Sequence, residues 1–235
     1  MLETNNRVLS SLPASSCEGI LGDCERVHLP GRTILDRVDT VPDVVHFPET
    51  AVISTIATYG DGSSIEMANI GREACTGIGL ILGYPRQLNT NEVQLAGTAL
   101  AMRAERFVEH KNSVPAFAEA LLATVQAVVY QVMVSGACNG IHSAKQRLAR
   151  WLLTMRDRRE QDIMYLTHDF LAEMLGVRRA TVTETLRDLQ WSGLVAYSRG
   201  QVRITDPQGL HDVSCECYDL VRHVYEVVLP PLDRS

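Results

Sequence analysis

The sequence predicts an α+β protein in which short strands come first and helices follow. Residues 25–106 contain short runs rich in β-branched residues, separated by Gly- and Pro-containing turns. After Pro115 the apolar residues recur every three or four positions, as in a helix. Near residues 166–189 two short amphipathic segments flank a glycine. We therefore expect a strand-rich domain over residues 1–114, a long helix and hinge over 115–140, and a mainly helical domain over 141–235.

The strand-rich domain is predicted to be a β-sandwich or barrel, because many short strands follow one another at close spacing. Tyr59-Gly60-Asp61-Gly62 has the composition of a hairpin turn, where glycine supplies positive φ. The expected strands cover 25–29, 44–47, 52–56, 65–70, 92–96 and 99–104.

The long helix carries an apolar seam whose members are three and four residues apart, which is typical of a helix that pairs with a second copy. The seam consists of Ala118, Leu121, Val125, Val128 and Val132. Leu122 and Val129 lie beside it and are expected to face the helix's own β-domain. Asn139-Gly140 is expected to interrupt the helix as a hinge. The alternative is a core helix within a single domain.

The C-terminal domain is predicted to contain a helix-turn-helix. A helix over 143–155 and a polar loop over 156–162 come first. Thr167 is a candidate N-cap for the next helix, and Gly176 suits the positive φ of a sharp turn. A second helix over 178–189 has Val182, Leu186 and Leu189 on one face. In such a motif the second helix enters the DNA major groove.

The candidate DNA contacts lie on the polar face of that helix and on a two-stranded wing over 193–205. Arginine pairs with guanine, threonine with several base edges, and glutamate with cytosine, whereas wing arginines contact phosphates. The candidates are Thr167, Arg178, Arg179, Ala180, Thr181, Thr183, Glu184, Arg187, Arg199 and Arg203. The alternative is a helical hairpin that binds protein.

The charge distribution agrees with a separate DNA-binding domain, although the net charge is −6. Residues 142–210 contain 11 Lys/Arg and 8 Asp/Glu, whereas the rest of the chain contains 11 and 20. Phosphates attract only the surface that meets them. The N-terminus does not resemble a signal peptide, and we see no uninterrupted apolar run of about 20 residues. We therefore expect a cytoplasmic protein without a membrane partner.

In order and spacing, several short stretches resemble the cyclic-AMP receptor protein/FNR (Crp/Fnr) superfamily of bacterial transcription regulators. They are Gly60-Asp61-Gly62, Ile70-Gly71-Arg72-Glu73, Arg147-Leu-Ala-Arg-Trp-Leu152, Leu166-Thr167 and Leu175-Gly176-Val177-Arg178-Arg179-Ala180-Thr181-Val182. The resemblance implies an N-terminal double-stranded β-helix (a jelly roll like cyclic-nucleotide-binding domains), a long dimerisation helix and a C-terminal winged helix-turn-helix. It further implies a homodimer on a near-palindromic operator in double-stranded DNA, with RNA polymerase as a candidate partner.

The resemblance also indicates a candidate effector pocket formed by Gly71, Arg72, Glu73, Thr90 and Asn91. Members that bind cyclic AMP have a Gly-Glu pair and an Arg-Ser pair there. Here an arginine separates Gly71 from Glu73, and Thr90-Asn91 replaces Arg-Ser. A buried phosphate without a cation is costly, so we expect an effector other than cyclic AMP. The recognition helix also departs from the family pattern, with Arg179, Ala180 and Glu184 at its three base-reading positions, which predicts a different operator.

The six cysteines are expected to be buried structural thiols without a metal. An iron–sulfur cluster usually takes four thiolates, and Cys17, Cys24 and Cys75 are too few. Cys215 and Cys217 alone do not make a zinc site. A thiol-based redox sensor at Cys75 or Cys138 is the alternative.

The sequence does not predict an enzyme, because it contains no recognisable catalytic grouping. Two other functions remain as alternatives. One is a ligand-binding or protein-interaction module whose winged helix no longer reads DNA. The other is a cupin-type metalloenzyme that uses the strand histidines His28 and His46.

Overall fold

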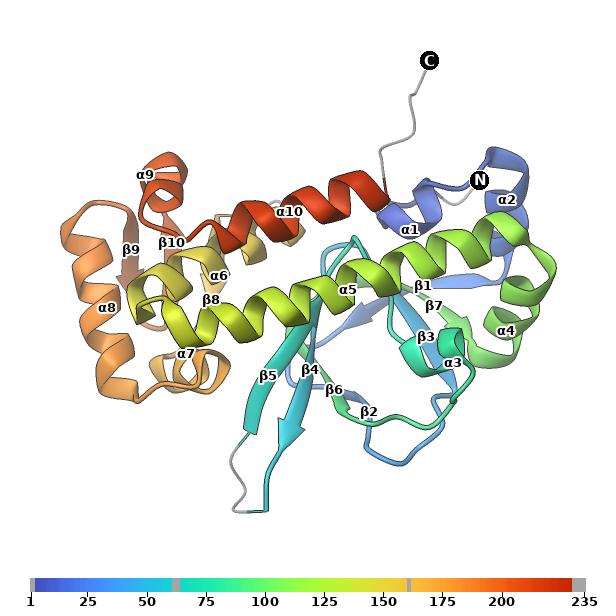
Figure 1. Cartoon of the computed structure of the whole chain (residues 1–235), viewed down its shortest axis with the longest axis horizontal. Coiled ribbons are helices and arrows are strands. Elements are labelled where there is room, and N and C mark those ends of the chain that lie inside the picture. Colours follow the sequence, from blue (N-terminus) through green and yellow to red (C-terminus); the bar gives the residue numbers. More distant parts are fainter. Residues whose placement is uncertain (1–2, 61–63, 160–161, 230–235) are drawn as a thin grey trace.

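The computed structural model describes residues 3–60, 64–159 and 162–229. A β-domain and a helix-turn-helix domain lie at the two ends of the molecule, and a long helix runs past both (Figure 1). A C-terminal helix lies beside the long helix and returns toward the β-domain. This architecture confirms the α+β prediction with a jelly-roll-like N-terminal domain.

The β-domain consists of two antiparallel sheets, one with the order β1-β7-β3 and one with the order β2-β6-β4-β5. All six predicted strands are present; β2 was not predicted, because it has only three residues. The expected turn residues Asp61 and Gly62 lie outside the described residues. The strands are β1 (Cys24–Leu29), β2 (Ile34–Asp36), β3 (Val44–Pro48), β4 (Val52–Thr58), β5 (Ser64–Ile70), β6 (Thr90–Leu95) and β7 (Gly97–Arg103).

Four short helices that the sequence analysis missed cover this domain: α1 (Arg7–Ser10), α2 (Ala14–Gly22), α3 (Ile78–Leu82) and α4 (Ala104–Ser113). Phe47 of β3 and Phe107 of α4 meet Phe117 of the long helix in a fully buried cluster, with ring centroids 5.6–6.3 Å apart. Buried aromatic rings contribute large apolar areas, so this cluster fixes the start of the long helix on the sheet.

The long helix α5 (Pro115–Ile141) has the expected location, but the predicted roles of its two apolar faces are wrong. Leu121, Val125 and Val128 are buried against the helix's own β-domain. Leu122 and Val129, which were expected to face that domain, are 54% and 52% exposed. Both faces have a helical period, so the sequence pattern could not decide which one meets the β-domain.

The expected hinge also lies slightly further along the chain than predicted. The helix continues through Asn139-Gly140 and ends at Ile141, and His142 then takes an extended conformation with φ −101° and ψ 145°. A helix can accommodate one glycine at a cost of about 1 kcal/mol relative to alanine.

In length and composition α5 would also suit a membrane span, with a mean hydropathy of 1.6 in its most apolar window. In this structure 39% of that window is buried within the protein. Core helices of folded domains have the same composition, and the contacts with the β-domain account for the buried face of α5.

The C-terminal domain begins with α6 (Ala144–Arg159), which extends into the segment expected to be a polar loop. Arg158, in that extension, is buried, and its interior partners explain why the helix continues. The wing is a three-stranded sheet rather than the expected two-stranded hairpin, because β8 pairs with β10. The remaining elements are α7 (His168–Leu175), α8 (Arg179–Trp191), β8 (Ile163–Tyr165), β9 (Val195–Ser198), β10 (Gln201–Ile204) and α9 (Pro207–Asp212).

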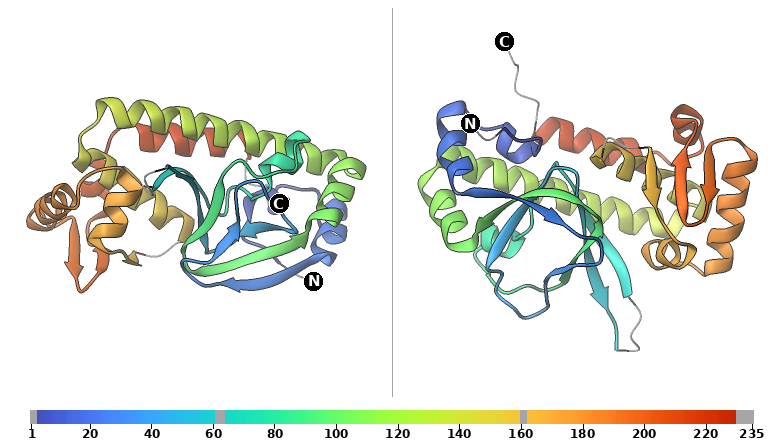
Figure 2. Two further views of the ribbon diagram at one scale, coloured as in Figure 1. Left: turned by 90° about the horizontal axis from the view of Figure 1, so that it is seen from below. Right: turned by 180° about the vertical axis from the view of Figure 1, so that it is seen from behind.

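The C-terminal helix α10 (Cys217–Val228) returns along α5 and contacts the β-domain, as both views in Figure 2 show. Val221 and Tyr225 belong to a core cluster that also contains β-domain residues. The Arg7 guanidinium donates to the carbonyl of Tyr225 at 3.0 Å. The C-terminal segment therefore holds the two domains together.

Acid sensitivity of the β-domain follows from the buried His46 on β3, whose pKa is lowered to about 4 by burial. Because the folded-state pKa lies below the unfolded value of 6.5, the neutral ring stabilises the fold fully above pH 6.5. This stabilisation is lost as the pH falls toward 4, and its full size is roughly 3 kcal/mol.

Between pH 7 and pH 5, we expect the free energy of unfolding to fall less for His46→Gln than for the unaltered chain. Urea unfolding at the two pH values measures this difference. His28→Gln is the matched control, because His28 is exposed on β1 of the same sheet. Equal acid sensitivity in all three proteins would contradict this origin.

Candidate nucleic-acid interface

The helix-turn-helix has the local geometry that its residues predict. The Thr167 hydroxyl caps α7 by accepting from the Phe170 amide at 3.2 Å. Gly176 then adopts φ 60°, a left-handed conformation that favours glycine. Val182, Leu186 and Leu189 of α8 are buried in the domain core. These contacts orient the opposite face of α8 outward.

All the candidate DNA-contacting residues are accessible at the surface. Thr181 is partly buried, and the others are exposed: Thr167, Arg178, Arg179, Ala180, Thr183, Glu184, Arg187, Arg199 and Arg203. Arg178 is the N-cap of α8 rather than its first helical residue. The N-terminal end of α8 thus combines two arginines with the unpaired amides of a helix start, an arrangement that suits an anionic partner.

Two of these residues have partners within the domain. Arg179 forms an ion pair with Asp169 at 3.2 Å on the surface. The Thr183 hydroxyl lies 2.9 Å from Nδ1 of His168 and also donates to the carbonyl of Arg179 at 3.1 Å. The His168 ring in turn lies against Tyr197 of the wing, with ring centroids 4.7 Å apart.

His168 therefore connects α7, α8 and the wing, a role that the sequence analysis did not predict. The His168 side chain is partly buried. Its position at the start of α7 is the only sequence signal, because Tyr197 lies 29 residues further along.

The wing carries its two arginines, Arg199 and Arg203, on the hairpin formed by β9 and β10. Arg199 and Gly200 have φ 50° and 77°, as expected of a two-residue turn of type I′. Arg203 is exposed on β10, opposite Ala196 of β9.

The candidate effector residues do not form one pocket. Asn91 is buried, donates to Asp36 at 2.8 Å and accepts from Thr55 at 3.0 Å. Glu73, by contrast, forms a buried ion pair with Arg158 of α6. A side chain at Gly71 would collide with Arg158. The segment Gly71-Arg72-Glu73 thus packs against the C-terminal domain, whereas Asn91 is buried in the β-domain and Thr90 beside it is partly buried.

A polar network extends from this ion pair through the boundary between the domains. Arg158 donates to Asn69 and, at 3.0 Å, to Gln131 of α5, which also accepts from the Tyr225 hydroxyl at 3.0 Å. The Glu66 carboxylate accepts from four donors at 2.6–3.3 Å: Ser54, Asn69, Gln94 and Trp151. Burial nevertheless raises the pKa of Glu66 above its usual value, against the effect of these hydrogen bonds.

A cavity of about 430 Å³ opens beside this network. It lies between the β-domain, α6 and α10, and its lining includes Arg7, Arg72, Glu73, Arg156 and Arg222. Arg72 and Glu73 of the predicted pocket line it, whereas Thr90 and Asn91 do not.

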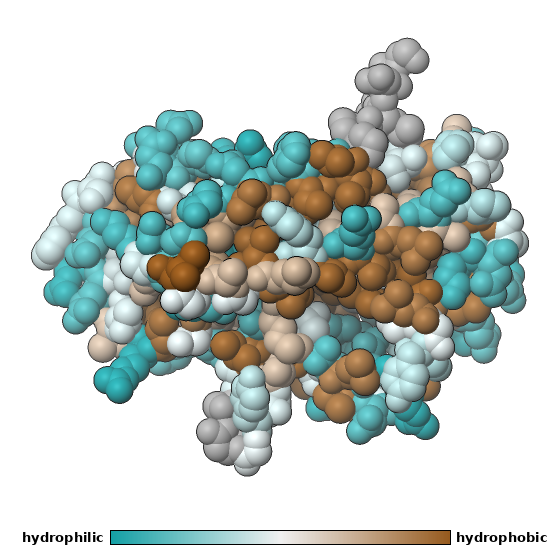
Figure 3. Space-filling view, viewed as in Figure 1, coloured by the Kyte–Doolittle hydropathy of each residue, from teal (hydrophilic) through white to brown (hydrophobic). Residues whose placement is uncertain are grey.

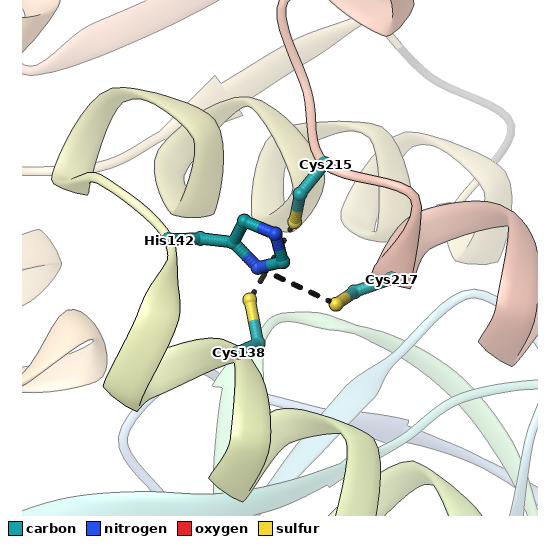
Figure 4. Close-up of side chains that lie close together, drawn as sticks. All are labelled: Cys138, His142, Cys215 and Cys217. Carbon is teal, nitrogen blue, oxygen red and sulfur yellow. Dashed lines mark hydrogen bonds between the residues drawn. The ribbon is translucent and has the colours of Figure 1, made fainter.

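The cysteines fall into two groups. Cys17 and Cys24 are partly buried, and burial raises the pKa of the fully buried Cys75 to about 12, which makes that thiol a poor redox sensor. Cys138, Cys215 and Cys217 form a separate buried cluster beside His142 (Figure 4). The expectation that Cys215 and Cys217 lack companion metal ligands is therefore wrong. The spacings Cys138-x₃-His142 and Cys215-x-Cys217 were the signal, but 72 residues separate the two pairs.

His28 and His46 do not form the cupin-type site that was considered. Among the residues that the structure describes, neither belongs to a group of three or more His, Cys, Asp or Glu side chains that could hold one ion.

A β-domain, a long helix and a winged helix-turn-helix follow one another in this order along the chain. Residues 146–213 match the model of the Crp-like helix-turn-helix domain. A search of curated proteins found no match.

Many solved structures have the same fold. A Crp/Fnr-family regulator from Eubacterium rectale is 19% identical, with a TM-score of 0.62 over 86% of this chain and 94% of that one. FixK2 from Bradyrhizobium japonicum is 16% identical, with a TM-score of 0.65 over 82% and 98% of the two chains. The c-di-GMP-responsive regulator CLP from Xanthomonas campestris is 16% identical, with a TM-score of 0.65 over 82% and 99%.

The chain therefore contains a Crp-like helix-turn-helix domain over residues 146–213, and it has the fold of the Crp/Fnr-family regulators named above.

The buried ion pair at the domain boundary yields a stability prediction. Arg158→Met leaves the Glu73 carboxylate buried without its cation, and we expect a loss of about 3–5 kcal/mol in urea unfolding. Arg156→Met, which removes a partly exposed ion pair from the same helix, should cost no more than about 1 kcal/mol.

The double variant Glu73→Leu/Arg158→Met should be more stable than Arg158→Met alone, because no unpaired charge remains. Additive losses in the double variant would show that the two charges do not interact.

Proposed function

We propose that this protein is a sequence-specific DNA-binding transcription regulator in which α8 enters the major groove. The observation that carries this proposal is the division of α8 into two faces. Val182, Leu186 and Leu189 anchor one face in the core, whereas the other presents Arg179, Thr183, Glu184 and Arg187 to solvent. These residue types match the donors and acceptors of base edges. Arg199 and Arg203 of the wing contact phosphates and set the register.

The regulator acts as a homodimer paired through the outer face of α5, and binds a near-palindromic operator in the cytoplasm. Leu122, Gln126, Val129 and Met133 are exposed and are spaced four, three and four residues apart, which is the spacing of a coiled-coil seam. Figure 3 shows apolar side chains gathered over α5 in the view of Figure 1. An apolar stripe of this length is unusual on the free surface of a protein.

The alternative is a module that binds a ligand or a protein and no longer reads DNA. Selection from a random DNA pool by the purified protein distinguishes the two. A two-fold symmetric motif with half-sites about one turn apart is the expected result. Recovery of no motif, both with and without added cell extract, would contradict the proposal.

Dimerisation can be tested by placing charge on the outer face of α5. Val129→Glu/Met133→Glu introduces carboxylates into an apolar interface and should weaken dimerisation at least about 100-fold. Sedimentation should then find monomers at concentrations where the unaltered protein is dimeric. The control is Leu88→Glu, at a site 71% exposed in a loop of the β-domain. A monomeric unaltered protein, or a double variant that stays dimeric, would rule out this interface.

Base reading can be tested by comparing an α8 arginine with a wing arginine. Arg179→Ala should cost about 1–3 kcal/mol at the selected operator and relax the preference at one base pair. Arg203→Ala should weaken binding to operator and random DNA alike and lower the salt dependence. Binding would be measured by fluorescence anisotropy at several salt concentrations. If Arg179→Ala affects both DNAs equally, Arg179 contacts only phosphate.

A further inference from the structure

Four potential metal ligands meet where the long helix ends and the C-terminal helix begins. Cys138 and His142 come from the last turn of α5 and the residue that follows it. Cys217 is the first residue of α10, and Cys215 lies two residues before it (Figure 4). One ligand atom from each of the four side chains lies within 4.8 Å of all the others. The Sγ atoms of Cys138 and Cys215 are 3.5 Å apart, and Cys217 Sγ lies 3.6 Å from His142 Nδ1.

Local structure holds each pair of ligands in register. The His142 amide donates to the Cys138 carbonyl at 3.0 Å, so the helical turn places residues four apart on the same face. The Tyr218 amide donates to the Cys215 carbonyl at 3.1 Å and closes the turn that contains Cys215 and Cys217. These backbone hydrogen bonds thus hold each pair of ligands within one turn.

The imidazole of His142 is oriented as in metal sites. Its Nδ1 faces the thiols, while Nε2 lies 3.4 Å from the Glu216 carboxylate. A carboxylate on the far nitrogen fixes the tautomer and leaves the near nitrogen free to ligate, as second-shell carboxylates do at zinc centres.

Packing alone does not account for this cluster. Its buried members are three cysteines, and Val134 is the one partly buried hydrophobic residue packed against them in the described part of the chain. Valine or leucine would fill the same space with more apolar contact. A disulfide between Cys138 and Cys215 would not account for the positions of Cys217 and His142.

We propose that Cys138, His142, Cys215 and Cys217 bind a single Zn²⁺ ion in a closed tetrahedral site. Three thiolates and one imidazole are a common ligand set of structural zinc. With Zn–S bonds of about 2.3 Å, the sulfur atoms of a tetrahedral site lie about 3.8 Å apart, close to the separations in this cluster. An iron–sulfur cluster needs a wider set of ligands, since its four ligands are divided among two or four iron atoms.

The ion would join α5, α6 and α10 at the hinge between the domains. His142 is the residue at which α5 ends, and α6 begins two residues later. Arg147 of α6 donates to the Leu175 carbonyl at the end of α7, so α6 is tied to the helix-turn-helix. A bound ion therefore fixes the angle at which the C-terminal domain leaves the long helix.

The first test is the metal content of the full-length protein, purified under reducing conditions and loaded with Zn²⁺. We expect about one ion per chain after dialysis. Cys138→Ser and Cys215→Ser should retain less than about a tenth of that amount. Cys17→Ser/Cys24→Ser, which removes two cysteines outside the cluster, should keep the full amount. No bound ion, or an ion that the Cys138→Ser and Cys215→Ser variants retain, would overturn the proposal.

Co²⁺ provides a second readout that does not depend on how well the variants fold. In the unaltered chain Co²⁺ should give the intense visible bands of tetrahedral coordination together with sulfur-to-cobalt charge-transfer bands, and Zn²⁺ should abolish both. Absence of these bands in reduced protein would overturn the site. So would a Cys138–Cys215 disulfide, found by mass spectrometry, in a protein that binds no metal after reduction.

Metal binding does not depend on the proposed DNA-binding function. The effect of the metal on the hinge can nevertheless be measured as a change in operator affinity. Chelation should lower operator affinity in the unaltered protein and leave the affinity of Cys138→Ser unchanged. Because metal content is measured without DNA, failure of the metal site and failure of DNA binding are distinguishable.

Discussion

The ion pair between Arg158 and Glu73 joins the two halves of the chain in an interior from which water is largely excluded. Isolated charges in such a place are costly, so each must keep its partner and its hydrogen bonds. Arg158 comes from α6, and its other partners come from β5 and α5. The C-terminal domain can therefore adopt only positions that keep this side chain in place.

Helices α5 and α10 are connected to the same buried ion pair through hydrogen bonds. The inner face of α5 completes the β-domain core, and Gln131 on that side accepts from both Arg158 and Tyr225 of α10. The outer face remains exposed and apolar. One helix thus couples the β-domain, the C-terminal domain and the surface at which we propose that a second copy binds. A change in the angle of α5 would move all three together.

The cavity beside the network and the cysteine cluster occupy the two ends of this junction. The cavity is lined by arginines and carboxylates from both domains. The cluster lies at the opposite end of α6, where α5 stops and α10 starts. Both sites are formed by segments far apart in sequence, so their geometry depends on how the two domains are held against each other.

The sequence by itself determined the local elements: the six longer strands, the Thr167 cap, the turn at Gly176 and the exposed face of α8. These depend on periodicity, capping and turn chemistry over a few residues. Only the tertiary structure decided which face of α5 is buried, since both faces have a helical period. It also decided that Arg158 packs against Gly71 and pairs with Glu73, and that Cys138 and His142 lie beside Cys215 and Cys217. Contacts across 70 residues or more arise from packing, which no local pattern encodes.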